Sequence, residues 1–257
     1  MIERISRLSG EAFRYDYLNT KTPVIITDMM ADWPAITLWN QEYLTKVCGD
    51  QMVEVMGDRD SDPLFEINSY AFRTSMRFAE LAALSFSSIV SNDIYMVSMN
   101  RFMATDGGQY LMKDVRSLPY LTEDPNPDQV FFWFGPAGTV TPLHYGSVNI
   151  IFTQVRGSKH FRLYPPDQTP WLYNSIGIFS AVDAENPDLE RYPLFQHAQA
   201  DELDIMAGEV LFIPKGHWHQ VRSLTPSISV SFANLAHDNI NRVARHNARR
   251  RARRHRK

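Results

Sequence analysis

A chain of 257 residues with 44% hydrophobic and 12% aromatic residues can bury a sizeable core, which excludes a disordered chain and favours one large domain or two small ones. No run of about 18 apolar residues occurs, and no apolar segment follows Met1–Arg4, so we expect neither a membrane span nor an export signal. The single cysteine, Cys48, cannot form an intramolecular disulfide, which agrees with a reducing compartment. We therefore expect a cytoplasmic protein.

The net charge of -3 hides a marked asymmetry between the body and the C-terminal end of the chain. Residues 242–257 carry nine Lys or Arg and no Asp or Glu, which leaves 17 basic and 29 acidic residues in 1–241. A basic tail of this kind could contact nucleic acid, an acidic partner or the acidic body, and a solvated helix is an equally good interpretation. We expect residues 1–241 to form a single domain that precedes this tail.

Residues 1–128 have mixed α and β character. Residues 22–26 read as a short buried strand, and the alternation over 53–55 is typical of a half-buried strand. Apolar side chains lie at helical spacing over 39–44. A separate set of apolar side chains predicts an amphipathic helix over 75–86. We interpret this part of the chain as an N-terminal support for the strands that begin near residue 129.

From Gln129 onward the sequence consists of short runs of β-branched and aromatic residues separated by Gly and Pro. The predicted strands are 129–134, 148–155, 159–164, 209–213, 218–223 and 227–232. No helical pattern separates them, so they favour an antiparallel barrel or sandwich with its core at about 129–235. The long excursion 167–208 contains three prolines, and such an insertion in a barrel is commonly a substrate-binding element.

The stretch Thr139–Ser147 contains the first chemical feature, His144. A histidine two residues before a carboxylate, with a second histidine roughly 70 to 80 residues later, is typical of a non-heme iron site. Here Gly146 stands where the carboxylate would be, and the later histidines are His217 and His219, just after the predicted strand 209–213. Alone, His144 would more often be a structural histidine, but together these residues predict a metal site.

A basic residue on a neighbouring strand could serve the same site. Lys159 lies on the predicted strand 159–164, whose alternate residues can point inward. By itself it would more often be a surface lysine. An iron site that uses an anionic cosubstrate needs such a fixed cation, so we single it out.

Several fragments carry a family resemblance. They are Thr141–Gly146, Gln154–Lys159, Leu163–Pro166, Asp188–Gln196, Ala207–Pro214, Pro23–Ile26 and Asp32–Ala35. Together they resemble the JmjC or cupin-like 2-oxoglutarate-dependent oxygenases over residues 20–235, and within that family the asparaginyl hydroxylase of hypoxia-inducible factor. The resemblance implies a mainly β fold with flanking helices, a double-stranded β-helix of the cupin or jelly-roll type. It also implies Fe(II) and 2-oxoglutarate as cofactors, and a dioxygenase that hydroxylates a peptide, protein or amino-acid-derived side chain.

The same resemblance assigns roles by position. His144 and His219 would be the iron ligands. Lys159 would form an ion pair with the distal carboxylate of 2-oxoglutarate, and Thr141 and Tyr110 would add hydrogen bonds.

Other positions depart from the family pattern. His217 falls where an aromatic residue is usual, so we expect it to lie behind the ligands or to face the substrate. The asparagines that hold the target amide in the asparaginyl hydroxylase correspond to Ile150 and Ser231, so we expect a different substrate. Related oxygenases also lead us to consider a homodimer.

The glycine at position 146 leaves three interpretations open. Water fills the vacant ligand position and hydroxylation persists, or chloride fills it and the enzyme is a halogenase, as in iron and 2-oxoglutarate halogenases with Gly or Ala there. In the third, the site is inactive through natural or engineered substitution and the chain acts as a binding module. Loss of a carboxylate raises the charge of an iron site by one unit, which favours an anion in the gap.

Overall fold

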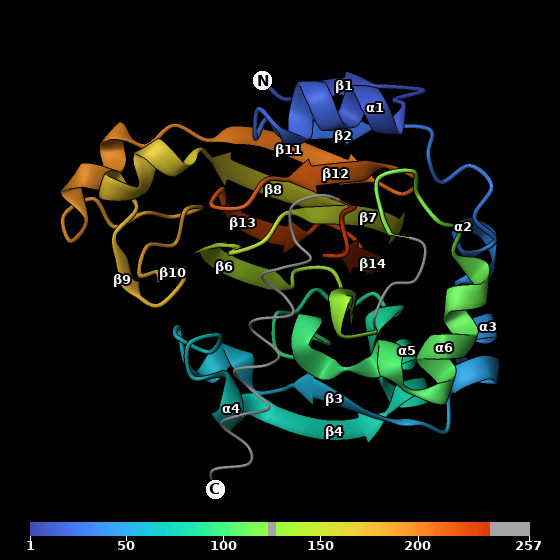
Figure 1. Cartoon of the computed structure of the whole chain (residues 1–257). Helices are drawn as coiled ribbons and strands as arrows, with labels where there is room; N and C mark the ends of the chain where they lie inside the picture. The colour runs from blue at the N-terminus through green and yellow to red at the C-terminus, as the bar shows by residue number, and fades with distance from the viewer. Residues whose placement is uncertain (123–126, 237–257) are drawn as a thin grey trace, which may run out of the picture.

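The computed structural model of the protein describes residues 1–122 and 127–236, so the basic tail at 242–257 lies outside the described residues. Over these residues two sheets face each other (Figure 1). The larger sheet has the order β1 (Glu3–Ile5), β2 (Val24–Ile26), β12 (Val210–Ile213), β7 (Ile150–Arg156), β14 (Ser227–Phe232) and β5 (Val130–Gly135). The smaller has the order β11 (Asp201–Met206), β8 (Ser158–Tyr164), β13 (Trp218–Ser223), β6 (Val140–Tyr145), β10 (Phe179–Ser180) and β9 (Asn174–Ile176). The predicted fold class, mainly β with flanking helices, is confirmed.

The N-terminal part supplies the helices and a further strand pair. Strands β3 (Met52–Met56) and β4 (Arg73–Arg77) pair with each other. The helices are α1 (Gly10–Ala12), which continues as a π-helix over Phe13–Leu18, α2 (Ala35–Leu38), α3 (Gln41–Cys48), α4 (Ser69–Phe72), α5 (Phe78–Ser85) and α6 (Asp106–Leu111). Within the described residues, no helix is long and apolar enough to cross a membrane.

Alternate residues of the larger sheet face two different cores, because side chains of a strand point to opposite faces. Ile25 and Leu211 pack with Phe161 and other apolar residues between the two sheets. Their neighbours on the same strands join a second core that includes Trp39 and Phe78 of the helical part. The N-terminal helices therefore cover the outer face of the larger sheet, and the two sheets enclose the barrel interior.

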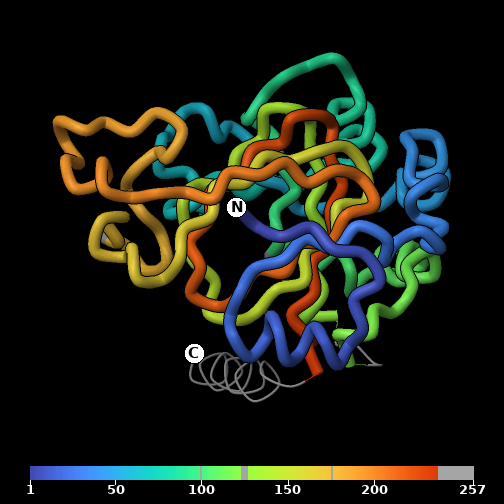
Figure 2. Tube along the Cα trace, turned by 90° about the horizontal axis from the view of Figure 1, so that it is seen from above, coloured from blue at the N-terminus to red at the C-terminus, as the bar shows by residue number. Residues whose placement is uncertain are grey.

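A third core lies on the outer face of the smaller sheet. Leu143 and Trp218 of that sheet pack there against Leu172, Val182 and Phe195 of the long insertion. Seen from above, the insertion projects to one side of the barrel (Figure 2). Its apolar side chains therefore fix it to the strands that carry the two candidate histidines.

The six strands predicted from residue 129 onward are confirmed, with ends that differ by at most two residues. Two predictions differ from the structure. The predicted excursion 167–208 ends in β11, which pairs with β8 along its whole length. The predicted helix over 75–86 begins only at Phe78, because residues 73–77 pair with β3 instead.

Candidate metal and cosubstrate site

A bulge in β6 places the candidate site residues on one face of the sheet. His144 lies opposite His219 on β13, and Thr141 lies opposite Val221, so two residues of β6 stand against one of β13. Pro142 lies at this irregularity, where its missing N–H costs no ladder hydrogen bond. Thr141 and His144, three apart in sequence, consequently both point into the barrel.

The two histidines form a close pair, and the backbone fixes one nitrogen of each ring. Their ring centroids are 4.1 Å apart. His144 Nδ1 lies 2.8 Å from the carbonyl oxygen of Pro142, and His219 Nδ1 lies 3.2 Å from that of His217. A proton on each Nδ1 makes both bonds and leaves the Nε2 lone pairs available, which is the tautomer that metal ligands adopt.

Burial also keeps both rings uncharged at neutral pH. It lowers the pKa of His144, and burial together with the neighbouring His144 lowers the pKa of His219 well below its usual value. Each side chain nevertheless keeps part of its surface exposed. Two neutral, accessible imidazoles are suitable donors for a divalent transition metal.

Gly146 leaves space at the position of the expected third ligand. A Cβ added there would meet only the carbonyl oxygen of Val148, at 3.4 Å, which is ordinary van der Waals contact. In the described part of the chain, no group of three His, Cys, Asp or Glu residues is placed to hold a metal ion. The side chains therefore fit a metal held by two imidazoles, with further positions available to a bound cosubstrate and a small anion or water.

Lys159 is buried inside the barrel near this pair of strands. Its side chain is 1% exposed, and its Nζ lies 2.8 Å from the hydroxyl of Tyr95. The rings of Tyr95, Trp133 and Phe152 surround Nζ, with centroids between 5.3 and 5.8 Å away. Burial lowers the pKa of Lys159 to about 7. A buried ammonium without an ion-pair partner among the described residues is suited to an anionic ligand.

Further polar side chains lie on the inner face of the larger sheet. Ser229 Oγ donates to the side-chain oxygen of Gln154 at 2.8 Å, and Trp133 Nε1 donates to Ser231 Oγ at 2.9 Å. The two serines alternate with apolar residues along β14, so they share its inner face. The barrel interior is thus apolar in one region and polar in another, as an enclosed site for a polar small molecule requires.

The tyrosine that lies against Lys159 in the structure is Tyr95, whereas the predicted Tyr110 lies elsewhere, on an exposed helix face. Tyr95 is buried and its hydroxyl also has a side-chain hydrogen bond with Thr141. Tyr110 lies on α6, where it is 47% exposed and Lys113 Nζ lies 4.8 Å from its ring centroid. Sequence reasoning missed Tyr95 because it is far from both partners in the chain. It is positioned by isolated bridges of Tyr95 and Met96 to the neighbouring strands.

A buried arginine packs against the ring of Tyr95. The guanidinium carbon of Arg59 lies between the rings of Phe65 and Tyr95, 4.2 and 5.2 Å from their centroids. Arg59 Nη2 donates to the carbonyl oxygen of Val140 at 2.6 Å and lies 3.4 Å from Glu66 Oε1. Arg59 therefore holds both Tyr95 and the beginning of β6, the strand that carries Thr141 and His144.

Replacement of Glu66 by alanine is expected to lower the free energy of unfolding by about 3 kcal/mol, because it leaves the fully buried Arg59 charge without its carboxylate. Chemical denaturation measures the change. Asp50→Ala is the control, since the exposed Asp50–Arg77 pair should contribute nothing measurable. Equal stability of the Glu66 variant and the wild type would contradict the assigned buried pair.

His217 contributes through its backbone. Its carbonyl oxygen fixes Nδ1 of His219, while its own ring is buried just before β13. Burial lowers the pKa of His217, and its Nδ1 has no partner among the described residues. His217 therefore directly precedes the candidate ligand His219 and orients its ring through the backbone.

Comparison with known proteins places the chain in a family. A family model described as a cupin-like domain matches residues 10–233. The chain is 36% identical to lysine-specific demethylase 8 of Danio rerio over 246 residues, which cover 90% of this chain and 57% of that protein. It is 34% identical to lysine-specific demethylase JMJ30 of Arabidopsis thaliana, with 90% of this chain and 54% of that protein covered. It is also 29% identical to human HSPB1-associated protein 1, with 94% and 54% covered.

The chain thus spans about half the length of the curated relatives it matches. The match to the family model includes both histidine-bearing strands and the strand of Lys159. The family resemblance read from the sequence is confirmed, and the chain belongs to the cupin-like JmjC family.

Proposed function

We propose that the chain is an Fe(II)- and 2-oxoglutarate-dependent oxygenase that hydroxylates a side chain of a peptide, a protein or an amino-acid derivative. One observation carries the proposal. The paired His144 and His219 open toward the same barrel interior as Lys159, whose buried ammonium is bonded only to the Tyr95 hydroxyl in the described structure. A metal-chelating dicarboxylate fits both features at once.

Each residue has a defined task in this proposal. His144 and His219 hold the metal through Nε2, and their Nδ1 hydrogen bonds fix the ring orientation. Lys159, Tyr95 and Thr141 bind the distal carboxylate of 2-oxoglutarate. A bound Fe(II) supplies coordination positions for the keto acid and for oxygen. The surrounding aromatic rings exclude water, which strengthens the ion pair.

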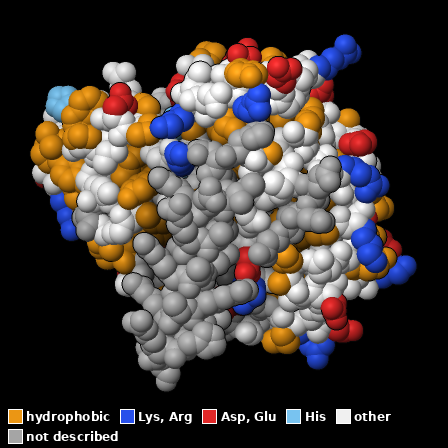
Figure 3. Space-filling view, in the orientation of Figure 1, with side chains coloured by type: hydrophobic (Ala, Val, Ile, Leu, Met, Phe, Trp, Pro, Cys, Tyr) orange, Lys and Arg blue, Asp and Glu red, His pale blue; other side chains and the backbone are white. Residues whose placement is uncertain are grey.

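A polypeptide is the proposed substrate class. Two of the relatives are named lysine-specific demethylases, which favours a protein side chain as the target. Apolar side chains also gather on the exposed insertion (Figure 3), namely Trp171, Ile176, Ile178, Leu189 and Leu194. Exposed apolar groups of this kind are typical of interaction surfaces.

Halogenation is the second candidate, and the space at Gly146 supports it. A chloride ion has room where the Cβ position meets only one atom at van der Waals distance. Product mass distinguishes the two reactions: hydroxylation adds one oxygen, and halogenation replaces hydrogen by chlorine. The assay needs anaerobically loaded Fe(II) protein that receives 2-oxoglutarate, oxygen and chloride with a peptide library.

Ligand binding tests the proposal before any substrate is known. Titration calorimetry should show that the wild-type protein binds Mn(II) and, in its presence, 2-oxoglutarate. A protein that binds neither would instead be a binding module that uses the barrel and the insertion as a surface. Binding without turnover would leave an inactive member of the family.

Binding of 2-oxoglutarate at pH 8 is expected to take up close to one proton. Lys159 has its pKa lowered to about 7 by burial, so it is largely neutral at pH 8 before the ligand binds. The bound carboxylate stabilises the ammonium, and the apparent affinity therefore falls as pH rises above about 7. Calorimetry in buffers of different ionisation enthalpy measures the uptake; no dependence on the buffer would contradict a neutral lysine.

A further inference from the structure

One segment of the insertion runs from β10 of the smaller sheet to the outer face of that sheet, and we call residues 178–185 the strap. At its beginning, Tyr145 N donates to the carbonyl oxygen of Ile178 at 3.1 Å, and Phe179 pairs with His144. The ring centroids of Phe179 and His144 are 5.8 Å apart. Because β6 lies between β13 and β10, Phe179 and His219 flank His144 on opposite sides.

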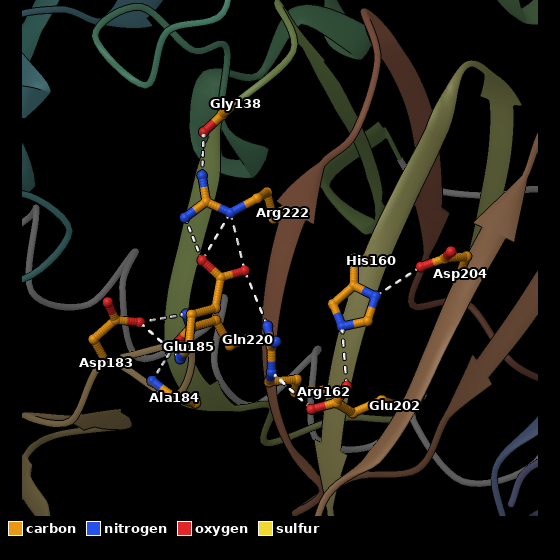
Figure 4. Close-up of polar contacts among 10 residues, drawn as sticks. All are labelled: Gly138, His160, Arg162, Asp183, Ala184, Glu185, Glu202, Asp204, Gln220 and Arg222. Carbon is orange, nitrogen blue, oxygen red and sulfur yellow. Dashed lines mark hydrogen bonds and ion pairs between the residues drawn. The ribbon is translucent and has the colours of Figure 1, made fainter. Parts of the chain in front are cut away.

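At its other end the strap is fixed to the outer face of the same sheet (Figure 4). The Glu185 carboxylate accepts from Arg222 Nε at 2.7 and 2.9 Å and from Arg162 Nη1 at 3.0 Å, and Arg222 Nη2 also bonds to it. Arg222 belongs to β13 and Arg162 to β8. One carboxylate therefore joins the strap to two strands.

A second pair of contacts lies beside this carboxylate. Gln220 of β13 accepts from Ala184 N at 2.9 Å and donates to Asp183 Oδ1 at 2.8 Å. Gln220 is buried, and it follows the ligand candidate His219 directly. The strap is thus bonded to the back of the strand whose front carries that histidine, because alternate residues of a strand face opposite ways.

The carboxylate of Glu185 is charged in this setting. Burial would raise the pKa of Glu185, but the hydrogen bonds from Arg222 and the charges of both arginines outweigh it and hold the pKa below its usual value. Its side chain is 12% exposed and those of Arg162 and Arg222 are 19% and 37% exposed. A partly buried, bidentate pair of this kind holds its geometry better than an exposed ion pair.

We propose that the strap forms one wall of the oxygenase site: Phe179 limits the size of groups that approach the metal beside His144, and Glu185 is the positioning residue that sets where Phe179 stands. This specificity role rests on the proposed function only for the metal. The strap itself stands on its two attachments, at Ile178–Phe179 and at Asp183–Glu185. Phe179 remains partly exposed, as a side chain that contacts substrate must be.

Amide hydrogen exchange of the metal-free protein tests the strap. The Glu185→Gln variant is expected to exchange about tenfold faster over 144–146 and 178–184, because loss of the charge weakens both arginine bonds and frees the Ile178 contact. The matched control is Glu202→Gln, since Glu202 also accepts from Arg162, at 3.0 Å, but lies on β11. Unchanged exchange in the Glu185 variant, or equal changes in both variants, would overturn the assigned attachment of the strap through Glu185.

Ligand selectivity of the Co(II)-substituted protein tests the wall. Imidazole and 4-phenylimidazole are titrated into protein that holds Co(II) and 2-oxoglutarate, and the cobalt absorption bands report binding. The preference for imidazole is expected to fall about tenfold in Phe179→Ala and in Glu185→Gln but not in Glu202→Gln, with Co(II) affinity unchanged in all three. A merely structural role of Glu185 would lower stability without changing this preference.

The two tests separate the possible failures. Wild-type protein that does not bind Co(II) would contradict the proposed function, and the exchange measurement would still decide whether Glu185 fixes the strap. An unchanged preference in Phe179→Ala would overturn the wall, even if the metal and 2-oxoglutarate bind as proposed.

Discussion

Replacement of Lys159 by methionine is expected to abolish 2-oxoglutarate binding and to raise the stability of the protein. The ammonium is the buried cation that would pair with the distal carboxylate, and removal of one partner of such a buried pair costs about 3 kcal/mol, or a factor of about one hundred or more in affinity. Methionine has a similar length and suits the cage of Tyr95, Trp133 and Phe152.

The gain in stability has a definite pH dependence. Burial lowers the pKa of Lys159 from 10.5 to about 7, so between these values the unfolded state binds more protons and wild-type stability rises with pH. Below about pH 7 the buried charge costs most, and the advantage of the methionine variant is largest there. The advantage should vanish toward pH 10 and above.

Calorimetry with 2-oxoglutarate and thermal unfolding at two pH values check both parts. Lys113→Met is the control, because Lys113 lies over the exposed Tyr110 ring and away from the buried lysine. It should change neither property. Retained 2-oxoglutarate affinity in Lys159→Met would contradict the assigned cosubstrate site, and a lower unfolding temperature below pH 7 would contradict the cost of the buried charge.

Replacement of Gly146 by aspartate is expected to tighten binding of Co(II) or Mn(II) by at least about tenfold, since even changes around metal ligands reach this size. The new Cβ meets only the Val148 carbonyl oxygen, at 3.4 Å, so the backbone at position 146 can carry a side chain. A carboxylate two residues after His144 completes the two-histidine, one-carboxylate set.

The matched control for this substitution is Gly146→Ala. Alanine occupies the same space without a donor atom, so its metal affinity should equal that of the wild type. Equal affinity of the aspartate and alanine variants would show that position 146 does not face the metal. In the aspartate variant, chloride should also lose any effect on metal binding, because the vacant position is filled.

The strands were predictable where the side-chain pattern is simple. Residues 227–232 alternate serine with apolar residues, and residues 150–156 form a run rich in β-branched and apolar side chains; both are strands. Strand β11 was missed although Leu203 and Ile205 alternate with acidic residues, because the prolines before it marked the whole stretch as a loop. The start of α5 was misplaced because pairing of residues 73–77 with β3 overrides their local pattern.

The residues of the candidate site were likewise predictable only in part. The sequence singled out His144, His219, Thr141 and Lys159, and the structure places all four on the inner face of the smaller sheet. Tyr95 was not predictable from local signals, because long-range bridges bring it there. The bulge in β6 was equally invisible, since it depends on pairing with β13.

Thermodynamic coupling between metal and cosubstrate tests the central claim, that the two histidines and the Lys159 cluster form one site. The affinity of 2-oxoglutarate is measured by calorimetry with and without Mn(II), for the wild type and for His144→Ala combined with His219→Ala. We predict that Mn(II) tightens 2-oxoglutarate binding about tenfold or more in the wild type and has no effect in the double variant. Equal affinity with and without Mn(II) in the wild type would contradict the claim.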